Sequence, residues 1–343
     1  KADFCVEAAL LSREMKAPVR VQWTREDDIR HDYLNTVATN RLTAGLDKKG
    51  HVVAWRHRTV FPSIATLFGG DAVPSMGDLQ QGVLDLALDI PHLSAEAGEA
   101  KAHTRIGWLR AVYNLFQAFS VGCFIDEIAH ARGSDPRDTW LELLGPARTA
   151  TLTELGIAEL RNYGQSLEQY PVDVGRLRGV LERVTKAARW EERTKDGRFL
   201  GLAAHRSFLS YAAVVASVVQ TPEGRIVVDE LWLAFDAGTV VNPDRVRSQM
   251  EGAAIFGMSL ALYGGITFKG GAVEQSNFLD GGRVVRMHEA PRITHVELVE
   301  SGAAPGGVGE PGVPPVAPAI VNAVFAMTGK RVRELPLSKS MKV

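Results

Sequence analysis

The stretch GGVGEPGVPP at residues 306–315, followed directly by the apolar run VAPAIVNAVFAM at 316–327, decides how this chain of 343 residues folds. Its glycines let the backbone approach a ligand closely, and its three prolines fix φ and remove N–H donors. Apolar residues of the second run recur at helical spacing, and Gly329 stands where a C-cap belongs. The pattern predicts that Glu310 lies on a stiffened loop just before a helix N-terminus.

The same glycines also satisfy a dinucleotide-binding pattern. Gly307, Gly309 and Gly312 have the spacing G-x-G-x-x-G, with Glu334 about 20 residues further on. That fingerprint needs a helix that opens within the glycines, so that N–H groups face a pyrophosphate. Here the prolines delay the helix and delete donors, which argues against a dinucleotide site. Taken alone, the loop is equally compatible with a surface turn that carries a solvated Glu310.

Other motifs give the loop a context. A Gly-Val-Gly-Glu sequence followed by prolines and an Ala/Ile/Asn-rich helix resembles the end of the large subunit of the molybdenum hydroxylases, the xanthine dehydrogenase and aldehyde oxidase family. The resemblance is strongest to the branch formed by the isoquinoline 1-oxidoreductase beta subunits. Further stretches fit that branch in the same order along the chain: residues 7–11, 17–27, 108–114, 124–127, 205–208, 236–243, 249–253 and 274–278. Matches in one order over most of the chain favour the family over chance.

The resemblance implies an α+β fold of the xanthine dehydrogenase large-subunit type. This is an elongated molybdopterin-binding domain of two mixed sheet/helix subdomains. We expect residues 1–195 to form a portion of the first subdomain, and residues 196–343 to form the second, which carries the Glu310 loop. Helix-like and strand-like stretches are mixed along the chain, in agreement with an α+β pattern.

The resemblance also implies a reaction. The family hydroxylates an sp² carbon, here of an N-heteroaromatic compound or an aldehyde, with oxygen derived from water. The cofactor is molybdopterin, expected in its cytosine dinucleotide form, and the molybdenum is held through the pterin dithiolene without direct protein ligands. Glu310 corresponds to the base that takes the proton, a role that typically contributes about 10² to 10⁴ in rate.

Further site residues follow from the same resemblance. Those expected to bind the cofactor are Arg110, Ala111, Gln249, Gly307, Val308 and Gly309. Those expected to wall a flat substrate are Trp108, Val112, Phe208 and Tyr211. Arg110 is equally compatible with an ordinary arginine before a helix, and core packing is the competing interpretation of each substrate-wall residue. Many family members have a glycine where this chain has Ala111, and the larger alanine would narrow the pocket. The additional glycines at 281 and 282 would lengthen a turn.

Two cofactor-holding loops of the family, Gly-Gly-Phe-Gly and Gly-Gln-Gly, have no counterpart here. The chain therefore resembles the C-terminal portion of a split, processed or truncated large subunit. We expect it to need the N-terminal part of that subunit, or a second chain that carries it. The alternative is a non-catalytic scaffold, or an assembly half that completes the cofactor site of another chain.

Composition limits the remaining partners. A net charge of −1 with scattered Lys and Arg argues against nucleic-acid binding. No apolar run approaches the roughly 20 residues that span a bilayer, and no signal peptide is visible. An iron–sulfur cluster usually needs four cysteines, and the chain has only Cys5 and Cys123. We therefore expect electrons to pass to a small two-iron two-sulfur subunit, with a cytochrome c as a candidate further carrier. Bacterial periplasm and cytoplasm both remain open.

Local patterns predict the elements. Helices are expected at 4–16, 114–132, 136–144, 174–190, 251–262 and 316–327, and a strand at 19–23. Hairpins are expected at 36–46 with 51–61, at 211–220 with 225–235, and at 266–268 with 272–275. We interpret 145–173 as a surface excursion, both cysteines as buried free thiols, and His51 and His57 as residues of a solvated strand edge.

Overall fold

The computed structural model describes residues 2–278 and 284–343, and it confirms the α+β class. In the described residues the α-helices are α1 (Asp3–Met15), α2 (Arg25–His31), α3 (Met76–Leu79), α4 (Asn114–Arg132), α5 (Pro136–Leu144), α6 (Val174–Ala187), α7 (Pro243–Leu262) and α8 (Val316–Thr328). The strands are β1 (Thr39–Leu46), β2 (Val52–Val60), β3 (His92–Gly98), β4 (Thr149–Ala150), β5 (Val172–Asp173), β6 (Phe199–Ser207), β7 (Ser210–Gln220), β8 (Ile226–Asp236), β9 (Phe268–Lys269), β10 (Ala272–Val273) and β11 (Ile293–Leu298).

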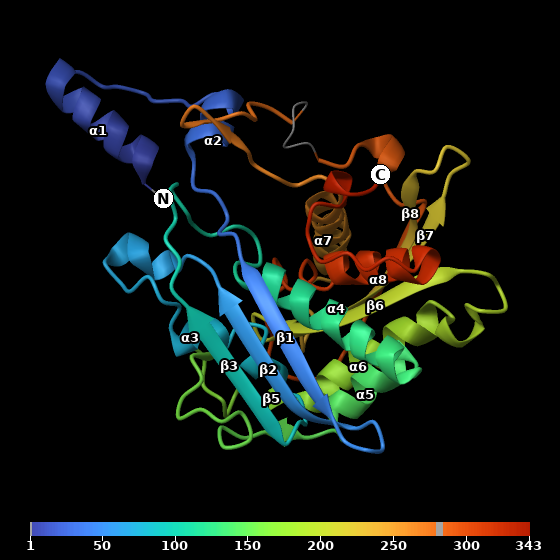
Figure 1. Cartoon of the computed structure of the whole chain (residues 1–343). Coiled ribbons are helices and arrows are strands. Elements are labelled where there is room, and N and C mark those ends of the chain that lie inside the picture. Colours follow the sequence, from blue (N-terminus) through green and yellow to red (C-terminus); the bar gives the residue numbers. More distant parts are fainter. Residues whose placement is uncertain (1, 279–283) are drawn as a thin grey trace.

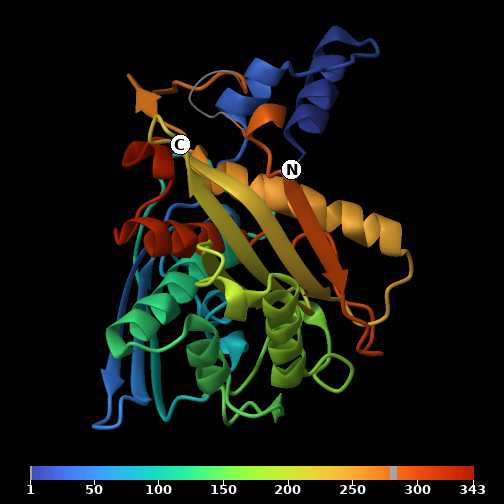
Figure 2. The same ribbon diagram turned by 90° about the vertical axis from the view of Figure 1, so that its right-hand side faces the viewer.

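The larger sheet has the strand order β11-β8-β7-β6. β6, β7 and β8 are antiparallel neighbours, and β11 joins the edge parallel to β8. Side chains alternate between the two faces of β7, as a strand requires. Ala212 and Val214 lie in a core with α7 and α8, whereas Ala213 and Val215 lie in a core with α6. Helices therefore cover both faces of this sheet (Figure 2).

A second sheet, β1-β2-β3, lies beside helix α4 (Figure 1). β1 and β2 form an antiparallel hairpin, and β3 runs parallel to β2. Trp55 of β2 is buried and meets Phe124 of α4 edge-on, with ring centroids 4.8 Å apart. Helix α4 also contacts α8 and β6, so it connects the two sheets. The loop that precedes α4 is thereby held close to the loop that precedes α8.

Most predicted elements are confirmed. The helices at 4–16, 114–132, 136–144, 174–190 and 316–327 appear as α1, α4, α5, α6 and α8, and the three hairpins appear as β1-β2, β7-β8 and β9-β10. The helix predicted at 251–262 begins earlier, at Pro243. Asn242 is its N-cap and accepts a hydrogen bond from the Arg245 N–H, and Pro243 occupies the first turn. The glycines at 281 and 282 lie outside the described residues.

Some predictions near the N-terminus are wrong. Residues 19–23 form no strand, since no neighbouring segment pairs with them in the described chain. Trp23 instead donates a hydrogen bond to Glu7 and meets the edge of Phe4, both on α1. Helix α1 buries none of its residues, so the thiol of Cys5 is exposed; only Cys123 is the expected buried free thiol. In Figures 1 and 2, α1 stands away from the rest of the chain.

Two further interpretations need correction. His57 is fully buried on β2, and burial lowers the pKa of its imidazole to about 4; His51, in the adjoining turn, is exposed as expected. The stretch 145–173 is not only a surface excursion, because it contains the short β4-β5 ladder and buries Leu155 and Asn162. The division of the chain near residue 195 stays a prediction.

Candidate functional site

Glu310 lies where the sequence pattern places it, on the loop that leads into α8. A turn closes directly after it, because the Val313 N–H donates to the Glu310 carbonyl over 3.1 Å. Val316 begins the helix, and Gly329 ends it with φ of 68°. The first turns of α8 are buried against the larger sheet. The loop is therefore attached to rigid structure at its C-terminal end.

Arg110 joins three segments at this loop. Its Nε donates to the carbonyl of Gly309 over 2.7 Å. Its Nη2 donates to the side-chain Oε1 of Gln249 over 3.0 Å and to the Gln249 carbonyl over 3.1 Å. Partial burial lowers the pKa of the guanidinium, while the charge of Glu310 opposes that shift. The structure thus brings together Arg110, Gln249, Gly309 and Glu310, which are separated by up to 200 residues in sequence.

The two residues after Arg110 form a left-handed turn. Ala111 has φ of 77° and Val112 has φ of 50°, a region that side-chain-bearing residues rarely adopt. The Asn114 N–H donates to the Ala111 carbonyl over 3.0 Å as α4 begins. Ala111 is fully buried in a small apolar cluster with Ala253 of α7 and Val313 of the Glu310 loop. This packing holds the Ala111 backbone against the Glu310 loop.

The carboxylate of Glu310 is only partly satisfied. Its Oε2 is buried and has no hydrogen-bond partner among the residues that the structure describes. Partial burial raises the pKa of this carboxyl, and the backbone N–H of Ala111 and the charge of Arg110 oppose the rise. The guanidinium of Arg110 donates its hydrogen bonds to Gly309 and Gln249. Arg110 therefore supports the loop without a direct hydrogen bond to the Glu310 carboxylate. A partly desolvated carboxylate with one unpaired oxygen is suited to accept a proton.

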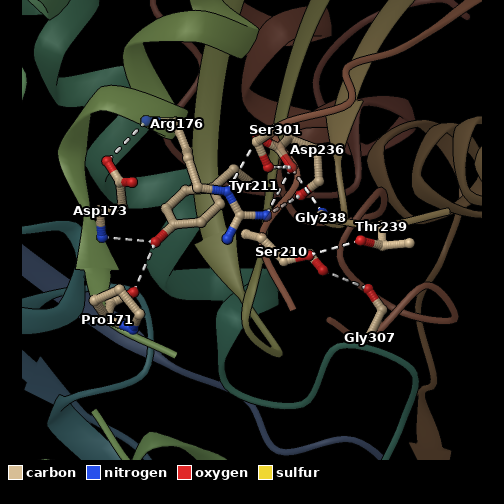
Figure 3. Close-up of polar contacts among 11 residues, drawn as sticks. Pro171, Asp173, Arg176, Ser210, Tyr211, Asp236, Gly238, Thr239, Ser301 and Gly307 are labelled. Atoms are coloured by element: carbon tan, nitrogen blue, oxygen red, sulfur yellow. Dashed lines mark hydrogen bonds and ion pairs between the residues drawn. The ribbon is translucent and has the colours of Figure 1, made fainter. Parts of the chain in front are cut away.

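The N-terminal end of the loop is tied to the larger sheet. The Gly306 N–H donates to the Ala237 carbonyl over 2.7 Å. The Gly307 N–H donates to the Phe208 carbonyl over 2.8 Å, and the Ser210 hydroxyl donates to the Gly307 carbonyl over 2.7 Å. Figure 3 shows Ser210 and Gly307 in this arrangement. The loop is therefore fixed at both ends.

A buried ion pair lies behind this attachment (Figure 3). The guanidinium of Arg176 donates to both carboxylate oxygens of Asp236, over 2.6 and 3.0 Å. The same carboxylate accepts from the Gly238 N–H over 2.7 Å and from the Ser301 hydroxyl over 2.8 Å. Ser301 begins the segment that runs to Glu310. Asp236 thus anchors that segment to the end of β8.

The loop glycines have different surroundings. A Cβ on Gly307 would lie 2.9 Å from the Phe208 carbonyl oxygen, and one on Gly306 would lie 2.6 Å from the Leu209 carbonyl oxygen. A Cβ on Gly309 would meet nothing within 4 Å among the described residues. Gly306 and Gly307 are thus required by backbone packing, whereas Gly309 borders open space. Val308 packs against the core on the α7 and α8 side of the sheet.

The expected substrate-wall residues do not all lie together. Val112 is buried in an apolar cluster against which Phe208 packs, so these two share one wall. Trp108 is 52% exposed and contacts Phe68. Tyr211 is buried in the core, where its hydroxyl accepts from the Asp173 N–H over 2.8 Å and lies 3.2 Å from the Pro171 carbonyl (Figure 3). Core packing accounts for Tyr211.

The structure adds residues that the sequence does not indicate. The ring of Tyr163 contacts the ring of Phe208 in a tilted arrangement, with centroids 4.7 Å apart. Tyr163 comes from the stretch at 145–173 that the sequence pattern assigns to the surface. Ser210 and Asp236 bind or anchor the Glu310 segment. No local pattern marks Tyr163 or Ser210. Asp236 lies in a stretch that resembles the family, although its role in holding Ser301 depends on tertiary structure.

Two features are absent from the part of the chain that the structure describes. No cluster of three or more His, Cys, Asp or Glu side chains there has a geometry that could hold a metal ion. None of its helices combines the length and the apolar character needed to cross a membrane.

Comparison with known proteins shows which family the chain belongs to. Two family models described as molybdopterin cofactor-binding domains match residues 2–140 and 175–291. The chain is 30% identical to a nicotinate dehydrogenase subunit of Pseudomonas putida, over 98% of the chain and 28% of that protein. It is 29% identical to the isoquinoline 1-oxidoreductase beta subunit of Brevundimonas diminuta, over 98% of the chain and 40% of that protein. The chain thus spans less than half the length of these relatives.

Solved structures support the same fold. Quinoline 2-oxidoreductase of Pseudomonas putida superposes with a TM-score of 0.75 at 12% identity, over 98% of this chain and 66% of that one. The aldehyde oxidoreductase of Desulfovibrio desulfuricans superposes with a TM-score of 0.71 at 12% identity, over 97% of this chain and 52% of that one. The chain belongs to the molybdopterin cofactor-binding domains of the molybdenum hydroxylases, the xanthine dehydrogenase and aldehyde oxidase family. Within that family it is similar to the isoquinoline 1-oxidoreductase beta subunit.

Proposed function

We propose that this chain supplies the catalytic base, Glu310, of a molybdopterin-dependent hydroxylase that inserts water-derived oxygen at an sp² carbon of an N-heteroaromatic compound or an aldehyde. The observation that carries the proposal is the Glu310 carboxylate itself. It lies on a loop fixed at both ends, is partly desolvated, and has a buried oxygen with no partner among the described residues. A carboxylate with only a structural role would be expected to have its acceptor sites filled.

The residues around Glu310 fit the cofactor that the family binds. Gly309 borders open space, so the backbone there can be approached closely. The side chain of Gln249 is exposed, and the Arg110 bond to its Oε1 leaves the amide NH₂ available as a donor. Arg110, Ala111, Gln249, Gly307, Val308 and Gly309 would hold the pterin, in the cytosine dinucleotide form by analogy with the branch. The molybdenum would be carried by the pterin.

The reaction as a whole converts a C–H bond and water into a C–OH bond, two protons and two electrons. When bound, the molybdenum pterin supplies the centre that takes up those two electrons. Glu310 accepts one proton at its unpaired Oε2; burial raises the pKa of this carboxyl, and the Ala111 N–H and the charge of Arg110 oppose that rise. Val112 and Phe208 present an apolar wall that can orient a flat substrate and exclude water, with Trp108 nearer the solvent.

The electrons would leave through other chains. With Cys5 exposed on α1 and Cys123 buried in α4, the chain lacks the four cysteines that an iron–sulfur cluster usually needs. We propose that a small two-iron two-sulfur subunit accepts them, with a cytochrome c as a candidate further carrier. The N-terminal part of the large subunit, or a chain that carries it, would complete the cofactor site.

The test compares Glu310→Gln with the unaltered chain, each purified with the chains that accompany it. Metal and pterin content are measured, and activity is assayed with an aldehyde and with an N-heteroaromatic compound. Glu334→Gln, on the exposed C-terminal segment, is the matched control. We expect about one molybdenum per complex in all three, and a loss of about 10² to 10⁴ in kcat for Glu310→Gln alone. Complexes without molybdenum even in the presence of the partner chains would leave only the scaffold role.

A further inference from the structure

Three strained turns lie close to one another in this fold. Six of the non-glycine residues with positive φ in the described chain form three consecutive pairs: Ala111 and Val112, Asn162 and Tyr163, and Phe208 and Leu209. Their φ values range from 43° to 77°. This region is unfavourable for residues with a Cβ and persists only where the surroundings enforce it. Something in the structure therefore holds each pair.

The three turns contact one another although they are far apart in the sequence. The ring of Phe208 contacts the ring of Tyr163 in a tilted arrangement, and Phe208 also packs against the cluster that contains Val112. The hydroxyl of Tyr163 accepts from Nδ2 of Asn114, the first residue of α4, over 3.4 Å. Nε2 of His205 lies 2.9 Å from Oδ1 of the same Asn114. The turns form a single group.

This group borders the Glu310 loop. The Phe208 carbonyl accepts from the Gly307 N–H, and Arg110, next to Ala111, donates to the Gly309 carbonyl. A shift of either turn would therefore move the loop that carries Glu310.

Behind the turns lies a fully buried ion pair. Nη1 of Arg206 donates to Oδ2 of Asp85 over 2.9 Å, and the two side chains are 1% and 3% exposed. Nη2 of Arg206 donates to Oδ1 of Asn162 over 2.6 Å. The other oxygen of Asp85 accepts from the Gly82 N–H over 2.7 Å. Each arm of the Arg206 fork thus has its own partner.

A buried ion pair of this kind contributes little net stability, because both charges lose their hydration. In some proteins such a pair instead selects one conformation. Arg206 is well placed for that use. Arg206 lies near the end of β6, two residues before Phe208. Its Nη2 binds Asn162, the first residue of the turn at 162–163. One side chain therefore fixes two of the three turns.

We infer that Arg206 is a positioning residue for the Glu310 site: bridged to Asp85 and Asn162, it holds the turns at 162–163 and 208–209. Through the contacts of Tyr163 with Asn114 and of Phe208 with the Val112 cluster, these two turns support the third, at 111–112, beside the catalytic loop. This inference rests on the proposed function. It assigns a mechanical role to a fully buried residue whose side-chain partners are Asp85 and Asn162.

The test is the variant Arg206→Lys in the loaded complex, purified with its partner chains. Lysine keeps the positive charge beside Asp85, but its single nitrogen cannot also reach Asn162 in the same fork geometry. The control is Arg331→Lys. Nη1 of Arg331 donates to Oδ2 of Asp126 over 2.9 Å in another largely buried pair. Asp126 lies 12 residues beyond Asn114 on α4, about 18 Å along the helix axis.

Two readouts are compared. Amide hydrogen exchange is followed at residues 110–114, 162–165 and 207–210, and kcat and KM are measured together with molybdenum content. For Arg206→Lys we expect faster exchange at all three turns, unchanged exchange in β7 and β8, unchanged molybdenum, and a fall in kcat of about 10- to 100-fold. Arg331→Lys should change neither the exchange of the turns nor kcat.

The inference is overturned if Arg206→Lys matches Arg331→Lys in both readouts. If Arg206→Lys does not fold, Asp85→Asn, which keeps an acceptor for Gly82, decides the matter by the same measurements. Failure of the proposed function is distinguishable. In that case Glu310→Gln retains activity or the complex holds no molybdenum, while the exchange result still reports whether Arg206 holds the turns.

Discussion

Asp236 and Glu310 are two carboxylates linked through the segment from Ser301 to Glu310, and they differ in their burial and in their hydrogen-bond partners. Asp236 is 1% exposed and accepts hydrogen bonds from Arg176, from the Gly238 N–H and from the Ser301 hydroxyl. Glu310 is partly exposed and keeps a buried oxygen without a partner in the described chain. Both have an arginine nearby. Arg176 forms a fork with its acid, whereas Arg110 binds the backbone beside its acid.

The difference in hydrogen bonding indicates a structural role for Asp236 and a chemical role for Glu310. A carboxylate that accepts several hydrogen bonds, as Asp236 does, fixes the segments bonded to it. A carboxylate with one oxygen unpaired in a partly dry place has its pKa raised, so it is nearer the value that a base needs. The same chain segment uses the first kind of carboxylate at Ser301 to position the second kind at Glu310. Changing each acid should therefore affect a different property.

The largest effect on stability is expected from Asp236→Ala. It would leave the charge of Arg176 unpaired in a buried place, which typically costs about 3 to 5 kcal/mol. Glu310→Ala removes a group with few partners and should cost less than about 1 kcal/mol. Urea unfolding at pH 7 of the two variants measures the difference. Equal losses would mean that the contrast between the two acids has no energetic basis.

A smaller effect is expected within the loop itself. In Gly306→Ala the new methyl group would lie 2.6 Å from the Leu209 carbonyl oxygen and would also displace the Ser210 hydroxyl from Gly307. Such overpacking typically costs about 1 to 3 kcal/mol. Gly309→Ala meets open space and should change stability by less than about 0.5 kcal/mol, while a Cβ there obstructs a cofactor.

Thermal unfolding and pterin content, measured on both glycine variants, check this pair. We expect Gly306→Ala to unfold at a lower temperature and Gly309→Ala to unfold normally but to bind less pterin. The reverse order of the two unfolding temperatures would show that Gly306 is not held against Leu209.

Much of the fold is predictable because its elements carry local patterns. Helix α8 has apolar residues at helical spacing and Gly329 at its end, and the turn at residues 47–50 separates two strand-like runs, so both can be recognised from the sequence. The strands β3, β6 and β11 cannot be delimited in this way, since their positions depend on pairing with distant neighbours. The prediction for His57 is wrong for the same reason, because nothing local shows which side of β2 faces the core.

The site is predictable only in part. Glu310 stands out because glycines and prolines surround it, and the family resemblance indicates Arg110 and Gln249, which the structure brings together with it. The supporting residues are not predictable. Tyr163 and Arg206 act through contacts across more than 40 residues of sequence, and a left-handed turn at a non-glycine residue leaves no pattern in composition.

The smallest expected effect is the pH-dependent change in stability of Glu310→Gln, and it tests the contrast between Glu310 and Asp236 most directly. Burial raises the pKa of Glu310 in the folded chain, so the folded state holds that proton more tightly than the unfolded state does. Ionisation of Glu310 therefore opposes folding: its penalty is absent below the ordinary glutamate pKa of about 4, and it grows as pH rises through the folded pKa. Glu310→Gln should accordingly stabilise the protein at pH 7, and this gain should vanish near pH 4. Because Glu310 is partly exposed, we expect less than about 1 kcal/mol.

Glu334→Gln should behave in the opposite way. The hydrogen bond from Lys339 lowers the pKa of Glu334, so its ionised form favours folding and its loss should slightly lower stability at neutral pH. Thermal unfolding of both variants between pH 4 and pH 8 makes the comparison. If Glu310→Gln also lost stability at pH 7, the Glu310 carboxylate would be a structural anchor like Asp236. A gain in stability together with a loss of activity is the combination expected of a base held in an unfavourable place for its chemistry.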